Sequence, residues 1–334
     1  MIEFIFTIDY EIYGNGEGSL EKLIYEPAAR LIDIFLKHNT HFVPFIEVAE
    51  LELIEANATD PIIDSVKKQI KYFHNNGFEL GLHLHPQWYN ARHDNGTWQL
   101  DYSEYNLCTQ SPKRINQIVE RSINYFRHIL GKNEFTPISF RAGNWLFQPT
   151  GNMAKVLTDH DIKIDSSVFK GGLQHQHQLD YRPAANNGYF WKFQDDVNKP
   201  ISNGTMMEIP IYTEMVPPWL MATKKRLGLQ QKAANSNKTA KQVFYRLLDM
   251  ARPLQPLKLD FCRMTMEELT IMMDKIFKDD QQEPQSLKPI VAIGHTKDLV
   301  DFITVDSFLS YLSKKNIKVV TFQEAYQAIN DTKQ

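Results

Sequence analysis

Two histidines in one predicted strand are the residues of this chain best suited to chemistry. From Leu80 onward apolar residues alternate with others, so the leucines share one face while His83 and His85 share the opposite face. Pro86 ends the strand directly after the second histidine. Histidine is the commonest metal ligand in proteins, and imidazoles two residues apart on a strand can reach one ion. The pair therefore predicts a metal or catalytic site at the carboxyl end of this strand.

Charged or titratable side chains also end other predicted strands. In parallel α/β folds the reactive residues gather at the carboxyl ends of the strands, so these side chains are expected to meet the histidines. They are Asp9 and Glu11 after the first strand, then Arg141, Asp165 and His295. Exposure of a strand end to solvent explains any one of these residues, but five such strand ends together predict a single site.

Mixed nitrogen and oxygen donors of this kind are typical of a catalytic zinc site. Asp9 and Glu11 share one strand face and supply one carboxylate for a metal and one for proton transfer. A zinc ion lowers the pKa of its bound water to about 7 and polarises a carbonyl. Arg141 would keep the base ionised, and Asp165 would orient His295, which would protonate the leaving amine. These residues predict a metal-dependent amide or ester hydrolase.

A series of strands and helices must position these residues. Periodicity predicts strands near 2–9, 40–46, 80–85, 138–141, 162–168, 206–212, 289–294 and 318–321. It predicts helices near 26–38, 47–75 with an interruption at Pro61, 111–130, 151–160 and 305–315. Strands that alternate with helices indicate an α/β fold with mostly parallel strands, either a barrel or a doubly wound sheet.

Composition narrows the functional class. The 334 residues are 43% hydrophobic with a formal net charge of −3, whereas nucleic-acid-binding domains usually carry a basic excess. The only cysteines, Cys108 and Cys262, exclude a disulfide framework and a cysteine-rich zinc site. The sequence shows neither a signal peptide nor an apolar run long enough to span a membrane, which predicts a cytoplasmic protein.

In their order along the chain, these motifs resemble those of the polysaccharide deacetylases of the NodB-homology type, a carbohydrate esterase family. The resemblance runs from Phe4 to about Ala325 and implies one catalytic domain over residues 1–334. The implied fold is a distorted (β/α) barrel with seven or eight mostly parallel strands. The implied reaction is removal of an N-acetyl group from an amino sugar or glycan, with a divalent metal, most commonly Zn²⁺. The segments His-Leu-His-Pro and Gly-His-Thr-Lys are similar to a branch found in surface-polysaccharide gene sets.

The resemblance implies a role for each matched residue. Asp9 matches the catalytic base, and Arg141 matches the residue that tethers it. The fourth motif matches at Asp165, which two serines follow, and the last motif matches at His295, the proton donor. These four residues are the predicted catalytic group.

The metal motif departs from the family pattern at two positions. Tyr10 stands where the family usually has a ligand aspartate, and Gln87 stands where it has the second histidine. Some branches place the acidic ligand one residue later, which implies Glu11, and His85 is the obvious substitute for the second histidine. The predicted metal ligands are therefore Glu11, His83 and His85.

Two other functions are compatible with these residues. One is a hydrolase of the same fold that opens a different C–N bond, such as a cyclic amide or ureide, with or without a metal. The other is a sugar-binding relative that has lost activity with its altered metal motif, since fold does not determine function. Bound metal together with deacetylation would distinguish a metal-dependent deacetylase from both of these alternatives.

Aromatic residues follow two of the motifs. Trp88 comes directly after the histidine motif and Trp145 after the arginine motif, so one of them is expected to stack on a sugar ring. Core packing is the alternative for both. His175 and His177 repeat the spacing of the strand histidines, but their glutamine-rich surroundings predict a loop.

Lys297 and Asp298 follow His295 directly. They could contact a substrate, but an exposed loop pair is the favoured interpretation. This position therefore adds no residue to the predicted site.

Residues 213–258 are not required by the barrel pattern and form a basic insertion that includes a predicted helix at 242–250. Between 224 and 258 the one acid is Asp249, and the apolar residues around Trp219 precede the basic cluster. Such a segment could contact anionic lipid on the inner leaflet, cover the active site as a lid, or bind a phosphate-bearing sugar donor. The cations are Lys224, Lys225, Arg226, Lys232, Lys238, Lys241, Arg246, Arg252 and Lys258.

Overall fold

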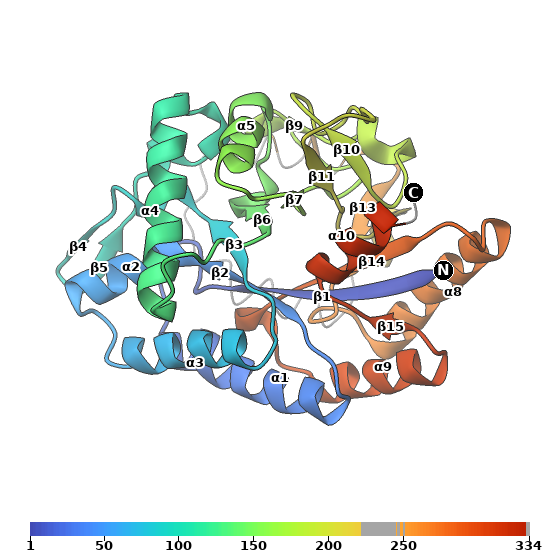
Figure 1. Ribbon diagram of the computed structural model, residues 1–334, viewed down its shortest axis with the longest axis horizontal. Coiled ribbons are helices and arrows are strands. Elements are labelled where there is room, and N and C mark those ends of the chain that lie inside the picture. The colour runs from blue at the N-terminus through green and yellow to red at the C-terminus, as the bar shows by residue number, and fades with distance from the viewer. Residues whose placement is uncertain (222–244, 246–247, 250, 332–334) are drawn as a thin grey trace.

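The computed structural model describes residues 1–221, 245, 248–249 and 251–331, which form a curled sheet surrounded by helices (Figure 1). The strands of the main sheet are β1 Ile2–Tyr10, β2 Val43–Glu47, β3 Gly81–Leu84, β6 Ser139–Ala142, β7 Ile164–Asp165, β10 Trp191–Phe193, β11 Met206–Glu208, β14 Lys288–His295 and β15 Lys318–Val319. The separate two-stranded sheets are β4 Arg92–Asp94 with β5 Thr97–Gln99, β8 Leu173–Gln174 with β9 Leu179–Asp180, and β12 Thr213–Val216 with β13 Gln255–Lys258. The helices are α1 Glu26–Lys37, α2 Val48–Asn57, α3 Ile63–Asn75, α4 Pro112–Leu130, α5 Gly151–Asp159, α8 Met266–Gln282, α9 Phe302–Lys314 and α10 Phe322–Asp331.

The main sheet curls until its two ends meet. Its order is β10-β11-β7-β6-β3-β2-β1-β14, with β15 beside β1, and every neighbouring pair except β10–β11 is parallel. Ile211, just after β11, forms parallel bridges with both Phe169 and Val291. Its N–H donates to the carbonyl of Val168 and the N–H of Tyr212 donates to the carbonyl of Val291, each at 2.9 Å. These bonds close the sheet and confirm the predicted distorted (β/α) barrel.

Helices cover the outside of the barrel. α8 packs on α9 and α9 on α1, while α3 packs on α4 and α4 on α5, so successive helices are neighbours (Figure 1). Strands enclosed in this way are buried on both faces and therefore contain nearly continuous apolar runs. β14 is buried along its whole length, and β1 is buried from Phe4 onward.

Local sequence signals explain where the helices begin and end. Ser111 caps α4 by accepting the N–H of Arg114 at 3.3 Å, Pro112 occupies the first helical position, and Gly131 follows the helix with a φ of +67°. This confirms the helix predicted at 111–130. The helical pattern predicted at 47–75 with an interruption at Pro61 is two helices, α2 and α3, and Ala58 ends α2 in the left-handed conformation with a φ of +50°.

Strand register brings predicted site residues to one level of the barrel. Asp9 on β1 pairs with His295 on β14. His83 on β3 lies between Glu47 on β2 and Arg141 on β6. Because these strands are parallel, their carboxyl ends open at the same end of the barrel.

The two ends of the segment 213–258 pair in a β-ribbon. β12 and β13 pair antiparallel, with Thr213 opposite Lys258. Trp219 is exposed over 73% of its surface. None of the described helices has the length and apolar character needed to cross a lipid bilayer.

Most of the basic cluster lies outside the described residues, as does most of the helix predicted at 242–250. Membrane contact through residues 213–258 therefore stays a prediction. The cations outside the described residues are Lys224, Lys225, Arg226, Lys232, Lys238, Lys241 and Arg246.

Candidate active site

A buried ion pair between Asp9 and Arg141 forms the centre of the site. Nη1 of the arginine donates to Oδ1 of Asp9 at 2.7 Å. Its Nη2 donates to Oγ1 of Thr7 and its Nε to the carbonyl of Ser166, both at 2.9 Å. The guanidinium also lies 4.2 Å from the ring centroid of Phe45. Arg141 is thus held on several sides and fixes one oxygen of Asp9, as the predicted tether requires.

The second carboxylate oxygen of Asp9 faces two imidazoles. Oδ2 lies 3.4 Å from Nε2 of His295 and 3.9 Å from Nε2 of His83. Burial alone would raise the pKa of Asp9, but Arg141 and the imidazoles outweigh burial and hold the pKa below its ordinary value. Asp9 is therefore an ionised carboxylate with one oxygen fixed and one directed into the site.

Beside Asp9, one oxygen of Glu11 meets the two strand histidines. Its Oε2 lies 2.9 Å from Nε2 of His85 and 3.4 Å from Nε2 of His83. All three side chains are buried, and Glu47 completes a group of potential metal ligands with them. In a tetrahedral zinc site with bonds of about 2.0–2.2 Å, ligand atoms lie roughly 3.3–3.6 Å apart. The two distances from Glu11 to the imidazoles are therefore close to the spacing of ligands to one ion, and all the ligand atoms of the group lie within 4.8 Å of one another.

A hydrogen bond fixes the His83 ring in a tautomer that suits a metal ligand. Its Nδ1 lies 2.8 Å from the carbonyl oxygen of Arg141, and because a carbonyl only accepts, Nδ1 carries the proton. When the ring is neutral, Nε2 has a free lone pair; this buried atom makes no hydrogen bond, and Oε2 of Glu11 lies 3.4 Å from it. An outer hydrogen bond that fixes the tautomer in this way is typical of metal-binding histidines.

The other ring contacts two side-chain amides. Nδ1 of His85 lies 3.2 Å from Nε2 of Gln87 and 3.3 Å from Nδ2 of Asn144, while Oε1 of Gln87 is buried without a partner. The orientation of an amide is an assignment made from its hydrogen bonds. Turning the Gln87 amide over would let Oε1 accept a proton from Nδ1 and leave Nε2 of His85 free for a metal. Gln87 thus fits a supporting role at the position where the family has its second histidine.

Further charged groups hold this cluster in place. Lys297 donates to Oε1 of Glu11 at 2.7 Å and to the carbonyl of Ile12 at 3.0 Å. Burial would raise the pKa of Glu11, but Lys297 and His85 hold it well below the ordinary value. Glu47 accepts the backbone N–H of His85 at 2.5 Å, and burial raises the pKa of Glu47 well above its ordinary value. The interpretation of Lys297 as part of an exposed loop pair is therefore wrong.

Close backbone packing also supports the second histidine. A Cβ added at Gly143 would lie 2.6 Å from the carbonyl oxygen of Leu84 and 2.8 Å from the ring of His85. Only glycine fits at this position without moving the ring, because real Cβ atoms do not make such contacts.

His295 is positioned differently from the prediction. Its Nδ1 lies 3.6 Å from Oδ2 of Asp298, which Nε of Arg263 contacts at 2.8 Å. Asp165 instead accepts from the hydroxyl of Ser167 at 2.7 Å, and no interaction joins it to His295 among the described residues. The expected Asp165–His295 pair is therefore absent there, and Asp298 lies in its place. Burial lowers the pKa of His295 to about 4.

The aromatic candidates differ in exposure. Trp88 is 1% exposed and packs against Trp98 with a centroid distance of 5.1 Å, so it is a core residue and cannot stack on a sugar. Trp145 is partly exposed, and its ring lies 6.2 Å from that of His295. Of the two tryptophans, only Trp145 is accessible, so stacking of Trp145 on a sugar ring stays a proposal.

The loop histidines lie in a short turn, as expected. His175 pairs with Asp249, and the ring of His177 lies 4.8 Å from that of Tyr105. Neither residue is in the group of potential metal ligands formed by the described residues.

Sequence reasoning missed two acids near the site. Glu47 directly follows the strand predicted at 40–46, so the strand-end argument that selected Asp9 would also have selected it. Glu50, which accepts the N–H of Ile12 at 2.9 Å, lies on α2 and carries no such signal.

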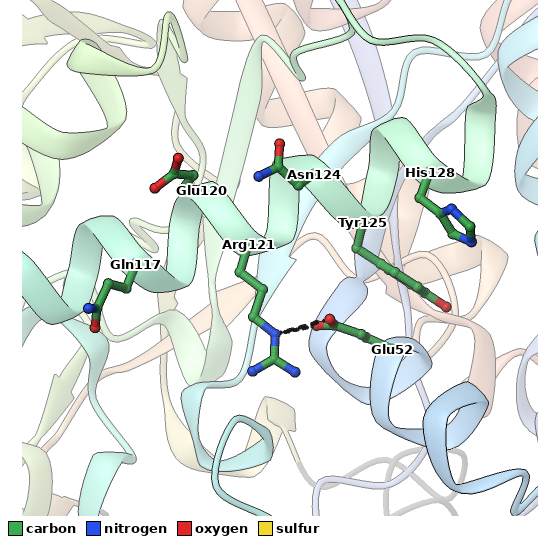
Figure 2. A pocket seen from close by; sticks show the side chains of 7 residues that line it. All are labelled: Glu52, Gln117, Glu120, Arg121, Asn124, Tyr125 and His128. Atoms are coloured by element: carbon green, nitrogen blue, oxygen red, sulfur yellow. Dashed lines mark hydrogen bonds and ion pairs between the residues drawn. The ribbon is translucent and has the colours of Figure 1, made fainter.

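A separate hollow of about 510 Å³ lies on the outer surface, between α4 and α2 (Figure 2). The Arg121 guanidinium crosses it to Glu52 at 2.8 Å. It contains none of the predicted site residues and offers no comparable convergence of reactive groups. Its lining residues are Glu52, Gln117, Glu120, Arg121, Asn124, Tyr125 and His128.

Comparison of the sequence with family models and with curated proteins gives no match. Comparison of the structure with solved structures does. A protein from Mycobacterium smegmatis assigned as a polysaccharide deacetylase aligns with a TM-score of 0.57 and 12% identity over 99% of this chain and 91% of that chain. A second such protein, from Pseudomonas aeruginosa PAO1, aligns with a TM-score of 0.50 and 12% identity over 97% and 89%.

A 4-alpha-glucanotransferase from Thermococcus litoralis also aligns, with a TM-score of 0.53 and 11% identity. This match covers 98% of the present chain but 38% of the glucanotransferase. At such identities a structural likeness establishes the fold and leaves the reaction open. The ordered motifs and the barrel together show that this chain has the fold of the polysaccharide deacetylases.

Proposed function

We propose that the protein is a metal-dependent deacetylase that removes an N-acetyl group from an amino sugar or glycan, in surface polysaccharide synthesis. The observation that carries the proposal is the unpartnered Nε2 of His83, which faces Glu11 and His85 beside the Asp9–Arg141 pair. A buried polar atom without a partner is costly, so its retention points to a missing ligand.

The donor set suits zinc. Glu11, His83 and His85 would hold the ion, with Glu47 beside them, and two imidazoles with one carboxylate leave a coordination position for water or substrate. When bound there, zinc polarises the acyl carbonyl and lowers the pKa of a water to about 7. Lys297 keeps the second oxygen of Glu11 occupied, so that carboxylate would bind through its other oxygen.

Asp9 is the proposed base. Arg141 holds Oδ1, so Oδ2 is the atom that accepts a proton from the attacking water. The water oxygen forms a bond to the acyl carbon, and the C–N bond of the amide then breaks. Acetate and an amine are the products, and the amine nitrogen needs one proton as it leaves.

His295 is the proposed acid, and Asp298 is the carboxylate that faces its Nδ1, at 3.6 Å. With a pKa of about 4 its ring is neutral at rest, and Nε2 lies 3.4 Å from Oδ2 of Asp9. The proton taken by Asp9 can therefore pass to Nε2 and from there to the leaving nitrogen. A ring with a low pKa holds this proton weakly and donates it readily.

Metal content and acetate release test the proposal together. Zinc is measured by elemental analysis, and acetate is measured with N-acetylglucosamine oligomers before and after chelation. We expect bound zinc, acetate release that chelation abolishes, and loss of both in a variant that combines His83→Ala with His85→Ala. His128→Ala, an exposed change on α4, should leave both unchanged.

Three results would contradict the proposal. Unchanged zinc content in the double histidine variant would exclude the metal site. Zinc binding without acetate release, combined with hydrolysis of a cyclic amide or ureide, would favour the other C–N hydrolase. Sugar binding without any turnover would favour an inactive relative.

A further inference from the structure

Lys258 is a cation beside the active site that the proposed mechanism does not use. It ends β13, the strand that returns residues 213–258 to the barrel, and it pairs with Thr213. The next residues are bonded to the barrel itself, since the carbonyl of Leu259 accepts from Ile293 at 2.9 Å and the N–H of Phe261 donates to Ile293 at 3.0 Å. Lys258 is therefore attached to a fixed ladder of hydrogen bonds next to β14.

Its side chain reaches the aromatic residues of the site. Nζ lies 3.1 Å from the ring centroid of Trp145 and 4.7 Å from that of Phe169. Trp145 is the tryptophan whose ring lies 6.2 Å from that of His295. The ammonium thus occupies a face of Trp145, which is the accessible one of the two tryptophans predicted to contact a substrate.

The ammonium of Lys258 has no hydrogen bond or ion pair within the described part of the chain. The nearest acid in sequence, Asp260, is engaged elsewhere: it accepts the N–H of Cys262 at 3.1 Å and lies 3.6 Å from Nε of Arg263. A contact with an aromatic face returns only part of the hydration that an ammonium loses. Burying a charge without a partner costs free energy, so this partly buried cation would be stabilised by an anionic ligand.

The electrostatic surroundings agree with this geometry. Burial lowers the pKa of Lys258 to about 7, while Asp260 acts in the opposite direction. Asp9 and Arg141 also act on it, which places Lys258 within electrostatic reach of the reacting centre. A bound anion would restore the charged form, because opposite charges at close range favour it.

We infer that Lys258 binds an anionic group, a carboxylate or a phosphate, on the acylated sugar that enters the site. The inference rests on the proposed function for the nature of the substrate. It also redefines the contact predicted for Trp145, because one ring face carries the ammonium. The substrate class is then an acidic N-acylated sugar, with a uronate or phosphate near the acyl group.

Affinities for three probes test this inference without requiring turnover. The probes are N-acetylglucosamine, N-acetylglucosamine 1-phosphate and N-acetylglucosaminuronic acid, titrated calorimetrically in an Asp9→Asn background so that none is consumed. At least one charged probe should bind about tenfold more tightly than the neutral sugar, a difference of about 1.4 kcal/mol. Comparison of the two charged probes shows whether the site prefers a phosphate or a carboxylate.

Substitutions of Lys258 then test whether this residue causes the preference for charged probes. Lys258→Met should remove the tenfold preference and leave affinity for the neutral sugar unchanged, whereas Lys258→Arg should retain part of the preference. Lys199→Met, which removes an exposed lysine paired with Asp196, is the matched control and should change nothing. Lys258→Gln replaces the methionine variant if that protein does not fold.

Two outcomes would overturn the inference. Equal binding of charged and neutral probes by the protein with Lys258 intact does so without any change at that residue. Survival of the preference in Lys258→Met does so as well. Acetate release by the wild-type protein is measured separately, so a lack of turnover refutes the proposed function while the affinities still decide the role of Lys258.

Discussion

Buried polar groups at the two ends of the barrel differ in how completely they are bonded. At the amino end, Lys288 starts β14 and donates to Oγ of Ser286 at 2.6 Å, to Oδ1 of Asp280 at 3.1 Å and to the carbonyl of Glu283 at 2.5 Å. At the carboxyl end, four of the seven buried side-chain atoms that lack partners in the described residues occur together, on His83, Gln87, Glu208 and His295. Glu3, in β1, is the exception near the amino end.

The polar groups at the amino end of the barrel contribute to stability, and those at the carboxyl end contribute to function. A satisfied buried charge holds the fold together, and nothing further can bind to it. Unsatisfied atoms cost stability and are retained where a ligand completes them, as expected at the carboxyl end of a parallel barrel. Changes at the amino end should therefore affect folding without affecting function, and changes at the carboxyl end should affect metal binding or turnover.

Asp9→Asn should give the largest effect. The asparagine keeps an oxygen that can accept from Arg141 but loses the base, so turnover should fall by about 10²–10⁴-fold. Zinc content should change little, whereas the free energy of unfolding should fall, because the buried Arg141 loses its counter-charge. Steady-state acetate release, elemental analysis and urea unfolding measure the three quantities. Near-normal turnover would show that Asp9 is not the base.

Lys288→Met should reduce stability and leave function intact. The substitution removes a buried cation and its hydrogen bonds to Asp280, Glu283 and Ser286, so the free energy of unfolding should fall by about 1–3 kcal/mol. Zinc affinity and turnover per folded molecule should stay at wild-type values. Urea unfolding measures the first, and a change in zinc affinity would show that the two ends of the barrel are coupled.

Gln87→Leu should weaken zinc binding by about 10–100-fold, because it removes the oxygen that can accept from Nδ1 of His85. Gln87→Glu retains an acceptor and should keep the affinity of the wild type. Competition with a chelating dye measures both. Equal affinity of the leucine and glutamate variants would show that Gln87 does not set the tautomer of His85.

Sequence reasoning succeeded where one strand determines the outcome. The position of His83 follows from the alternation of β3, and its place beside Arg141 follows from parallel strand ends meeting at one level. The α/β fold with mostly parallel strands was predicted for the same reason, since strand and helix patterns repeat along the chain, and the family resemblance narrowed it to a barrel. Such signals are local, and parallel topology brings them together.

The supporting contacts could not be predicted in this way. The Lys297–Glu11 pair joins residues 286 positions apart through side-chain geometry alone. Asp298, rather than Asp165, faces His295 because a short helical turn after β14 brings it back toward the ring. Trp88 is buried by Trp98, from a hairpin that strand–helix patterning does not anticipate. Each of these contacts depends on tertiary packing, which periodicity does not encode.

A substitution of Glu79, at the amino end of the barrel, should give the smallest effect. The effect is a change in the pH dependence of stability. Glu79 precedes β3 and accepts the N–H of Gln323 at 2.7 Å and the hydroxyl of Ser139 at 3.2 Å. Burial raises its pKa from 4.5 to about 7. The folded protein therefore binds this proton more tightly than the unfolded chain, and the stabilisation is complete below pH 4.5 and is lost as the pH rises to about 7.

Glu79→Gln should consequently flatten the pH dependence of stability. Other groups titrate in the same range, so the informative quantity is the difference between the wild type and the variant in the free energy of unfolding. That difference should shift in favour of the variant between pH 5 and pH 7.5 and then stay constant, as measured by urea unfolding. Glu134→Gln, an exposed carboxylate after α4, is the control and should show no such shift. A parallel pH dependence in Glu79→Gln and the wild type would mean that Glu79 is already ionised across this range, and the amino end would then hold a buried charge stabilised by its hydrogen bonds alone.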